Sequence, residues 1–461
     1  MDFISDHLSY AVAFVSLSAS LWASAHAVMY KRKSRAAASW VGLIWLSPLL
    51  GPLLYLLLGV NRTRSQIRSQ SPAAASRKTS SASDPIGLAV DRVARTRRVS
   101  GNLVSVLENG DEAYPAMKAA IMSARKSVRL CTYIFDRDRA GLEFAEVLGA
   151  AAARGVEVHV IIDDLGARYS LPSIIGHLKR QGITVARYHR SFWPWHLRYA
   201  NLRNHRKSLI IDGRVAFTGG MNIRAAHVLG WQHEEPVRDL HFRIEGPLVS
   251  QVDDAFCVDW EEATSDRLPI GAQGSGSRGP TVARCLADGP DDPANSIRWT
   301  LLAALACSRR RVRVVTPYFV PDAGLITALA TAALRGVVVE IILPEVNNLR
   351  IVKWASDATL WQVLERGCRV FKTNGPFDHS KLMIVDDHWC TFGSVNWDAR
   401  SLRLNFELNV ECRDPELVET LNAIVDQKLE GSRQVTLVGV DARSRLVRLR
   451  DGLARLLSPY L

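Results

Sequence analysis

Two long apolar runs occupy the first sixty positions of the chain. Leu8 to Tyr30 is mostly apolar although diluted by serines, and Trp40 to Val60 contains no charged residue. A helix of about 20 apolar residues crosses the hydrocarbon core of a bilayer, and both runs reach that length. We therefore predict a membrane anchor over residues 1–60, with hydrophobic segments at 8–30 and 40–60.

The flanks of the second segment do not determine on which side of the membrane the soluble part of the chain lies. Pro48 and Pro52 interrupt this segment, which could therefore be kinked or re-entrant. Basic residues flank it at 31–35 and at 62–78, and basic flanks favour the cytoplasm. Both flanks cannot be cytoplasmic if the second segment spans the bilayer fully.

Beyond residue 99 short apolar runs alternate with amphipathic ones, and the same order of elements occurs twice. Arg154-Gly155 and Arg335-Gly336 each precede an apolar run, as is typical of a strand buried on both faces. Strands that alternate with helices indicate an α/β sandwich with a mainly parallel or mixed sheet. The predicted strands are 128–135, 156–162, 183–188, 312–318, 337–343 and 368–372, and the predicted helices are 141–154, 174–181, 323–334 and 354–365.

Two stretches without apolar periodicity divide the chain. Residues 61–98 begin with a segment rich in Ser, Arg and Ala and predict a basic linker. Residues 265–282 are rich in Gly, Ser and Pro and predict a second linker. The expected fold class is therefore α/β, with two duplicated halves at 99–264 and 283–461 behind the membrane anchor.

The net charge of the chain favours an anionic binding partner. The chain has 461 residues and a net charge of +12, which suits either nucleic acid or acidic lipid, although part of this excess could be ordinary solubilising surface. Seven cysteines are scattered without a CxxC pair. Neither a zinc site nor a disulfide framework is therefore predicted.

The strongest signal is a set of five residues that occurs twice with the same spacing. A His is followed by a Lys two residues on, an Asp seven on, a Gly fourteen on and an Asn seventeen on. Two complete copies in two similar halves indicate one active site assembled from two half-sites. The copies are His205, Lys207, Asp212, Gly219 and Asn222, and His379, Lys381, Asp386, Gly393 and Asn396.

The spacing within each copy predicts local structure. Residues two apart on a strand face the same side, so each His and its Lys should reach one surface. Asp212-Gly213 and Asp386-Asp387 are turn formers, after which the next strand should run back as a hairpin. We therefore expect Asp212 and Asp386 to act more through structure than through chemistry.

Two His, two Lys and two Asn around one point suit a phosphodiester. Lys and Asn side chains bind the non-bridging oxygens and stabilise the transition state. One neutral His can attack phosphorus while the other protonates the leaving oxygen. Each His needs an acidic partner on its other ring nitrogen. The candidates are Asp239 and Glu407, which lie 34 and 28 residues after His205 and His379.

The motifs resemble the HxKxxxxD repeats of the phospholipase D superfamily, and the chain as a whole resembles the bacterial cardiolipin synthases. The resemblance rests on residues 201–223, 238–247, 316–322 and 379–408, on the apolar segment 40–62 and on the terminal LLSPYL. It implies that two phosphatidylglycerol molecules are condensed into cardiolipin and glycerol through a phosphohistidine, without a metal or another cofactor. It also implies that His205 is the nucleophile, that His379 is the acid and base, and that Asp239 and Glu407 support the two histidines.

The two apolar segments and the resemblance together predict a multi-pass protein of the bacterial inner membrane that binds an anionic phospholipid. Two membrane segments also argue against a nucleic acid partner. Three alternatives stay open: a phospholipase D that releases phosphatidic acid, a phosphodiesterase acting on nucleic acid, and a membrane scaffold with idle motifs. The sequence leaves open the acceptor, which could be phosphatidylglycerol, phosphatidylethanolamine or water. It also leaves the oligomeric state open.

Two accessory stretches suit a lipid substrate. The run 189–204 mixes aromatic and basic side chains, which is typical of a bilayer interface but also of a lid or a buried cluster. The tail 441–461 places leucines at helical spacing between arginines. It predicts a basic amphipathic helix that either lies on an anionic surface or packs on the domain.

Overall fold

The computed structural model describes residues 2–31, 34–59, 84–189, 202–269, 276–290 and 292–458. It contains an N-terminal helical unit and a larger body, and each is described by itself. The first part of the predicted basic linker and most of the run 189–204 lie outside the described residues.

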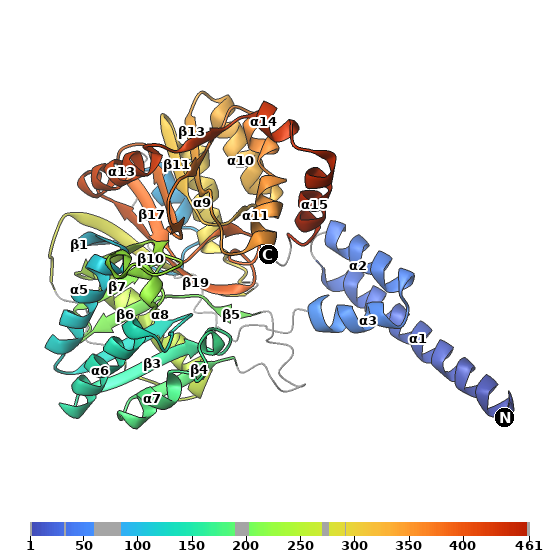
Figure 1. Ribbon diagram of the computed structural model, residues 1–461, viewed down its shortest axis with the longest axis horizontal. Helices are drawn as coiled ribbons and strands as arrows, with labels where there is room; N and C mark the ends of the chain where they lie inside the picture. Colours follow the sequence, from blue (N-terminus) through green and yellow to red (C-terminus); the bar gives the residue numbers. More distant parts are fainter. Residues whose placement is uncertain are drawn as a thin grey trace. The chain divides into compact units, whose positions relative to one another are not determined.

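The N-terminal unit contains one long helix and a helical hairpin (Figure 1). Helix α1, Asp2–Tyr30, is long and apolar enough over Tyr10–Tyr30 to cross a membrane, and no other helix among the described residues is. The second predicted segment is helical but is not one helix. It forms α2, Ser34–Leu46, a turn at 47–49, α3, Leu50–Leu54, and a π-helical turn, Tyr55–Gly59.

Proline and glycine explain why the second segment folds back on itself. Pro48 lacks the N–H that would continue α2. A Cβ at Gly51 would meet the Ile44 Cα at 2.6 Å, so only glycine lets α3 lie this close to α2. The Tyr55 ring packs edge-on against Trp40 with 5.2 Å between centroids. Residues 51 and 55 thus lie beside residues 44 and 40, and the chain runs back along α2.

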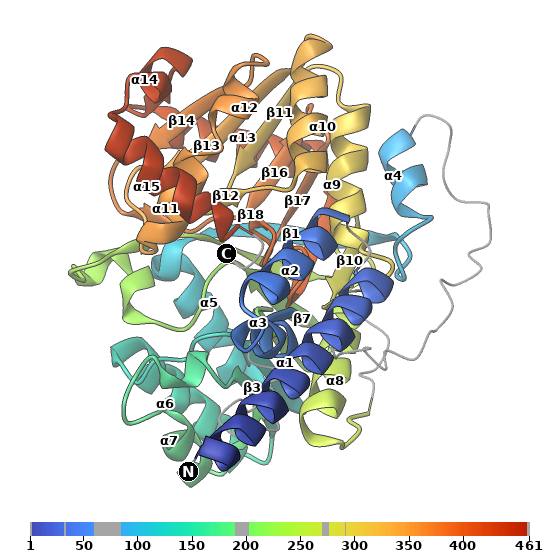
Figure 2. The ribbon, with the colours of Figure 1, turned by 90° about the vertical axis from the view of Figure 1, so that its right-hand side faces the viewer.

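The body consists of two similar halves, in whose described residues 16 strands form one mixed sheet and four others form two separate sheets of two strands each (Figures 1 and 2). The first half comprises β1 Val99–Glu108, α5 Asn109–Ser123, β2 Ser127–Thr132, α6 Arg139–Ala153, β3 Glu157–Asp163, α7 Ile175–Arg180, β4 Thr184–Tyr188, β5 Arg203–Asn204, β6 Ser208–Ile211, β7 Val215–Gly219, β8 Val237–Arg238, β9 Leu240–Glu245 and α8 Leu248–Thr264. The second comprises β10 Thr281–Asp288, α9 Ser296–Cys307, β11 Arg311–Val315, β12 Phe319–Val320, α10 Ala323–Leu334, β13 Val338–Pro344, α11 Arg350–Asp357, α12 Trp361–Leu364, β14 Arg369–Thr373, β15 Phe377–Asp378, β16 Leu382–Val385, β17 Trp389–Gly393, β18 Trp397–Asp398, β19 Asn405–Arg413, α13 Pro415–Leu429, β20 Arg433–Val435, α14 Leu437–Asp441 and α15 Arg445–Leu456.

The predicted α/β order is confirmed in both halves, with one error among the helices. The predicted helix 354–365 is wrong, because the chain forms α11 and α12 with a turn at 358–360 between them. The Thr359 hydroxyl bonds back to the Ala355 carbonyl at 2.9 Å in this turn. Such a bond competes with the helical hydrogen bonds of the backbone.

The two halves share a core and are joined through strands that the sequence pattern does not predict. β1 pairs antiparallel with β10, with Val99 opposite Ala283. Phe242 of β9 and Phe392 of β17 stack with 3.5 Å between their centroids. One large cluster of buried side chains includes residues from both halves, among them residues of α8 and α13. The halves therefore form one body.

Part of the predicted linker 61–98 is folded. Helix α4, Pro85–Val90, is capped by the Asp84 side chain, which accepts the Gly87 N–H at 2.9 Å. Ile86 and Val90 are buried in the core of the second half together with α9. The helix has only six residues, which is too short for a helical period of apolar residues to be recognised beside the Ser- and Arg-rich stretch.

Candidate active site

Each motif histidine stands directly after a short strand that pairs with the opposite half. His205 follows β5, which pairs in parallel with β19, and His379 follows β15, which pairs in parallel with β8. The His205 N–H donates to the Phe406 carbonyl at 2.9 Å, and the His379 N–H donates to the Arg238 carbonyl at 2.8 Å. The predicted strand position of the histidines is therefore wrong in detail, because they precede β6 and β16.

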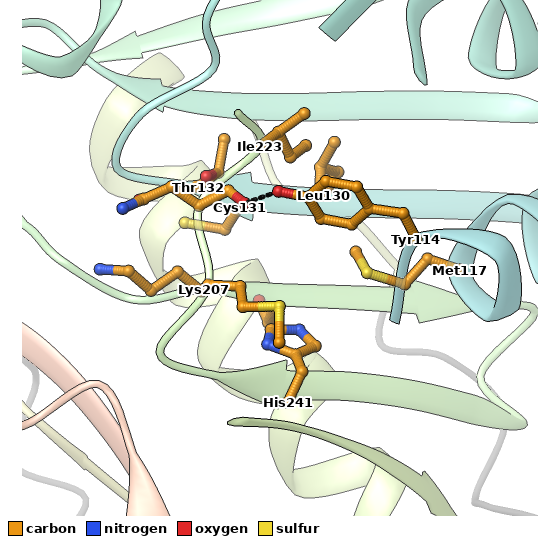
Figure 3. A pocket seen from close by; sticks show the side chains of 11 residues that line it. Tyr114, Met117, Leu130, Cys131, Thr132, Lys207, Ile223 and His241 are labelled. Carbon is orange, nitrogen blue, oxygen red and sulfur yellow. Dashed lines mark hydrogen bonds between the residues drawn. The ribbon is translucent and has the colours of Figure 1, made fainter. Parts of the chain in front are cut away.

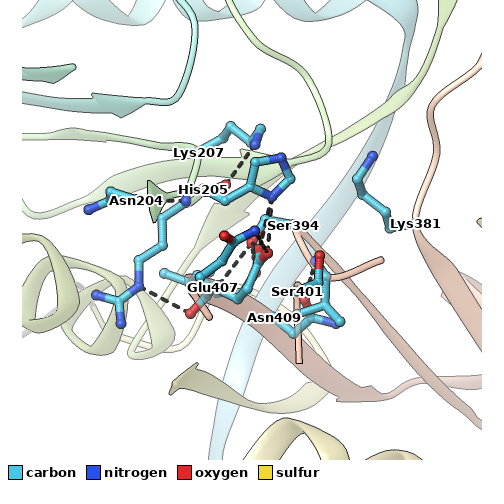
Figure 4. Close-up of polar contacts among 12 residues, drawn as sticks. Asn204, His205, Lys207, Lys381, Ser394, Ser401, Glu407 and Asn409 are labelled. Atoms are coloured by element: carbon cyan, nitrogen blue, oxygen red, sulfur yellow. Dashed lines mark hydrogen bonds and ion pairs between the residues drawn. The ribbon is translucent and has the colours of Figure 1, made fainter. Parts of the chain in front are cut away.

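The acidic partners are exchanged between the halves. Nδ1 of His205 lies 3.1 Å from both carboxylate oxygens of Glu407 (Figure 4). Nδ1 of His379 lies 2.8 Å from Oδ2 of Asp239. Order along the chain had suggested that each acid serves the histidine of its own half. The paired strands reverse this, and each carboxylate can hold an Nδ1–H while Nε2 keeps its lone pair.

The two carboxylates differ in their surroundings. Glu407 also accepts the Ser394 hydroxyl at 2.5 Å (Figure 4). Burial alone would raise the pKa of Glu407, but His205, a nearby lysine and Ser394 together hold this pKa below its ordinary value. Burial raises the pKa of Asp239, and Lys381 offsets the effect only in part. The neighbours of Glu407 therefore stabilise its ionised form, whereas burial disfavours the ionised form of Asp239.

The two motif lysines are buried beside the histidines. Nζ of Lys207 donates to the His205 carbonyl at 2.6 Å, and Nζ of Lys381 donates to the His379 carbonyl. Burial lowers the pKa of Lys207 to about 7 and that of Lys381 to about 8. Burial also lowers the pKa of His205 to about 4, and Lys381 of the other half adds to this effect. Charges of both halves thus act on one site.

The two motif asparagines are buried as well. The side-chain oxygen of Asn222 accepts the Ile134 N–H at 3.1 Å, which leaves its NH2 group for another partner. A cavity of about 10 Å³ beside Lys207, also lined by Asn222 and His241, has room for about one water molecule (Figure 3). In the described part of the chain, no three His, Cys, Asp or Glu side chains are arranged to bind a metal ion.

Aromatic side chains surround the histidines, and the motif spacing does not predict them as part of the site. Tyr133 packs edge-on against His205 with 5.3 Å between centroids, and Phe377 and Tyr318 contact the His379 ring at 5.8 and 6.2 Å. The sequence does contain a signal for these aromatic residues, because the similar stretches CTYIF (131–135) and VTPYF (315–319) occur at corresponding places in the two halves. These rings help to bury the imidazoles.

Asp212 and Asp386 lie in the predicted hairpin turns and bind backbone. Asp212 accepts the N–H groups of residues 125–127 at 2.7 to 2.9 Å, and Asp386 accepts those of residues 309–311 at 2.8 to 3.3 Å. Both have a positive φ, 52° and 53°. This geometry ties each hairpin to the start of the neighbouring strand, as a structural role requires.

We expect Asp386→Ala to lower the free energy of unfolding by about 2–4 kcal/mol, because three backbone N–H groups lose their acceptor. Asp387→Ala is the matched control. It removes an exposed carboxylate of the same turn that pairs with Arg310, and it should cost less than about 1 kcal/mol. Urea unfolding midpoints of the purified chain measure both losses. Equal losses would contradict the structural role.

Comparison with protein families gives two matches. A family described as "Cardiolipin synthase, PLD-like domain" matches residues 117–260 and 301–429, one stretch in each half of the body. A family described as "Phospholipase_D-nuclease N-terminal" matches residues 19–59, which lie in the helical unit. The duplicated halves and the apolar segments are thus covered by separate matches.

Curated relatives and solved structures agree with these matches. Cardiolipin synthase A of Pseudomonas putida (strain GB-1) is 30% identical over 458 residues, which cover 95% of both chains. A probable cardiolipin synthase of Bacillus subtilis (strain 168) is 30% identical over 366 residues, 78% of this chain and 72% of the relative. The crystal structure of phosphatidylserine synthase from Haemophilus influenzae Rd KW20 covers 78% of this chain and 95% of its own, with a TM-score of 0.62 at 16% identity. This last likeness concerns the fold alone.

Proposed function

The chain belongs to the bacterial cardiolipin synthases with a phospholipase D-like domain, and we propose that it condenses two phosphatidylglycerol molecules into cardiolipin and glycerol. One observation carries the proposal. Two His–carboxylate pairs, each assembled across the halves, share one site with two buried lysines. Such a pair of half-sites suits a reaction that breaks one phosphodiester bond and then makes another.

In the first step we assign the attack on phosphorus to Nε2 of His205. A P–N bond forms, the P–O bond to glycerol breaks, and His379 gives a proton to the glycerol oxygen. His205 suits this role because Glu407, whose ionised form is stabilised by its neighbours, can stabilise the positive charge that the His205 ring gains. Burial holds the pKa of His379 well below its ordinary value. A bound anionic phosphodiester raises this pKa and so favours the proton donor.

In the second step a glycerol hydroxyl of another phosphatidylglycerol attacks the phosphohistidine. His379 takes the hydroxyl proton, a P–O bond forms, the P–N bond breaks, and His205 leaves as neutral imidazole. We propose that Lys207 and Lys381 hold the non-bridging oxygens in both steps, supported by the amides of Asn222 and Asn396.

We expect kcat/KM for phosphatidylglycerol to fall as the pH rises through about 7 to 8. A lysine binds the phosphodiester only while protonated, and burial lowers the pKa of Lys207 to about 7 and that of Lys381 to about 8. Turnover at saturating lipid should fall only at a higher pH, because the bound anion favours the charged lysines. A basic limb of kcat/KM near the pKa of an ordinary lysine, about 10, would contradict this argument.

The products formed from phosphatidylglycerol alone test the proposed function. We expect cardiolipin and free glycerol from the chain in proteoliposomes, identified by mass spectrometry. Phosphatidic acid with glycerol would instead make water the acceptor, as in a hydrolytic phospholipase D. The double variant His205→Asn, His379→Asn is the control. Product formation at the parental rate in this variant would disprove the assigned site.

Relatives and an apolar N-terminal helix indicate a membrane-associated protein. We infer that α1 crosses the membrane once and that α2 and α3 enter and leave on the same side. Helix α2 has 13 residues, about 20 Å, which is too short for a core of about 30 Å. The Pro48 carbonyl at the turn accepts the hydroxyls of Ser16 and Ser20 at 2.9 and 3.3 Å. These bonds satisfy a polar group that the bilayer would leave unpaired.

This hairpin removes the conflict between the basic flanks. Residues 31–35 and 62–78 then lie on one side, and both satisfy the preference for the cytoplasm. We therefore place the catalytic body in the cytoplasm. Cysteines introduced at Ser34 and Ser76 should react with an impermeant maleimide only after spheroplasts are permeabilised, relative to the parent chain. Reaction from opposite sides of the membrane would show that the second segment spans fully.

A further inference from the structure

Helix α15 turns its most apolar face away from the body. It packs on α11 (Figure 2), with Asp451 and Ala454 buried on the packed side. Five leucines form one stripe on the other side of the helix. They are Leu446, Leu449, Leu453, Leu456 and Leu457, with exposed fractions of 79, 61, 57, 72 and 46%. The helix thus packs on the domain without using the stripe, which the described residues of the body leave uncovered.

Positive charge borders this leucine stripe on both sides. Arg450 lies along one border, and three exposed arginines lie along the other: Arg445, Arg448 and Arg455. The one carboxylate in α15, Asp451, is buried and pairs with Arg443 at 2.8 Å and with Arg450 at 2.7 Å. The exposed face of α15 therefore has an apolar centre and positive edges, and no acidic residue of the helix lies on it.

The packed side of α15 leads to the active site. Ala454 belongs to a small buried cluster together with Tyr318 and Phe377. Both of these rings contact the imidazole of His379, with 6.2 and 5.8 Å between centroids. The buried cluster to which Ala454 of α15 belongs thus includes the rings beside the histidine to which we assign the acid and base role. A surface that receives the leucine stripe would lie close to this half-site.

We propose that α15 docks on a bilayer of anionic phospholipid. The leucine stripe enters the boundary between headgroups and acyl chains, and the arginines contact the lipid phosphates. A second copy of the chain fits less well, because a symmetric contact through this helix would bring arginine borders together. The proposal deepens the proposed function and rests on it, since the docked surface is also the substrate. Docking brings the His379 half-site to the depth of the headgroups.

Spin labels on the full chain in phosphatidylglycerol vesicles test the docking. A label at Leu449→Cys should be accessible to oxygen and shielded from a water-soluble nickel complex. A label at Leu334→Cys is the matched control, because Leu334 at the end of α10 is 70% exposed, and the side chain of its neighbour Arg335 donates to the Leu305 and Ser308 carbonyls. It should remain accessible to nickel. Nickel access at position 449 equal to that at position 334 would overturn the proposal. This readout needs no turnover, so its failure is distinct from failure of the proposed function.

Turnover in two lipid environments gives the second test. The triple variant Leu446→Ser, Leu449→Ser, Leu453→Ser should lose about tenfold in turnover on vesicles. It should keep parental turnover on phosphatidylglycerol in detergent micelles, which need no docking surface. Leu334→Ser should change neither rate. Equal losses in vesicles and micelles would assign the stripe to folding and overturn the proposal. A change from dimer to monomer in the triple variant, with vesicle turnover retained, would overturn it in favour of a second copy.

Discussion

Replacing His205 by asparagine is expected to abolish the covalent phosphoenzyme and to lower turnover by at least about 10⁴-fold. Glu407 holds Nδ1 of His205, so Nε2 carries the free lone pair that attacks phosphorus. An asparagine amide has no comparable nucleophile. His379→Asn should behave differently, because it keeps the nucleophile and removes the proton donor and acceptor. Its phosphoenzyme should form slowly and then accumulate.

Trapping with lipid that is labelled in the phosphate measures both outcomes. The adduct should appear in the parent chain, remain in His379→Asn and be absent from His205→Asn. His233→Asn, at an exposed histidine outside the motifs, is the control for the substitution itself. An adduct in His205→Asn together with none in His379→Asn would exchange the two roles. No adduct in any of the chains would favour direct displacement of glycerol by the second lipid.

The residues of the site could be predicted because their pattern is local. His205 and Lys207 are held by the turn at Asp212-Gly213 and by the hairpin of β6 and β7, in which Ser208 lies opposite Thr218. Turn formers between two apolar runs make such a hairpin recognisable without a structure. The same spacing in the second half makes chance agreement improbable. Local spacing therefore predicted which side chains come together.

The exchange of acids between the halves could not be predicted in this way. It depends on β5 and β15, strands of two residues each that pair with the opposite half. Two residues carry no periodicity, and their partners lie more than a hundred positions away. The pairing of β1 with β10, which joins the halves, could not be predicted either, because Val99 and its partner Ala283 lie far apart in the chain and the tertiary fold decides which strands pair. The fold-back of the second apolar segment was one of the outcomes that Pro48 and Pro52 predict, and the close contact at Gly51 permits it.

The half-sites also differ at the position directly after the motif glycine, which is not one of the five repeated residues. Ser394 follows the motif glycine of the second half and donates to Glu407. Gly220 occupies this place in the first half, where a Cβ would lie 2.3 Å from Oδ1 of Asp239. The first half therefore has no room for a serine, and Asp239 has no such donor. This difference supports the division of roles in which Glu407 serves the nucleophile and Asp239 serves the proton carrier.

Glu407→Gln is expected to lower turnover by about 10²–10⁴-fold and to prevent phosphoenzyme formation. Both carboxylate oxygens of Glu407 lie 3.1 Å from Nδ1 of His205, so either orientation of the new amide places its NH2 group beside this nitrogen. The amide NH2 would then face Nδ1 of His205. Nδ1 would become an acceptor, the ring proton would move to Nε2, and the nucleophilic lone pair would be lost. The fold should persist, because the side chain keeps its volume.

Asp239→Asn should lower turnover to a similar extent but leave a phosphoenzyme that persists. The Leu240 N–H binds Oδ1 of Asp239 at 2.8 Å, so the new NH2 group would face Nδ1 of His379. The proton would move to Nε2, and His379 could no longer accept a proton from the second lipid. Time courses of the labelled adduct separate the two variants. If each acid served the histidine of its own half, Asp239→Asn would block formation of the adduct and Glu407→Gln would block its release. The contrast therefore tests whether the crossing of acids between the halves operates during turnover.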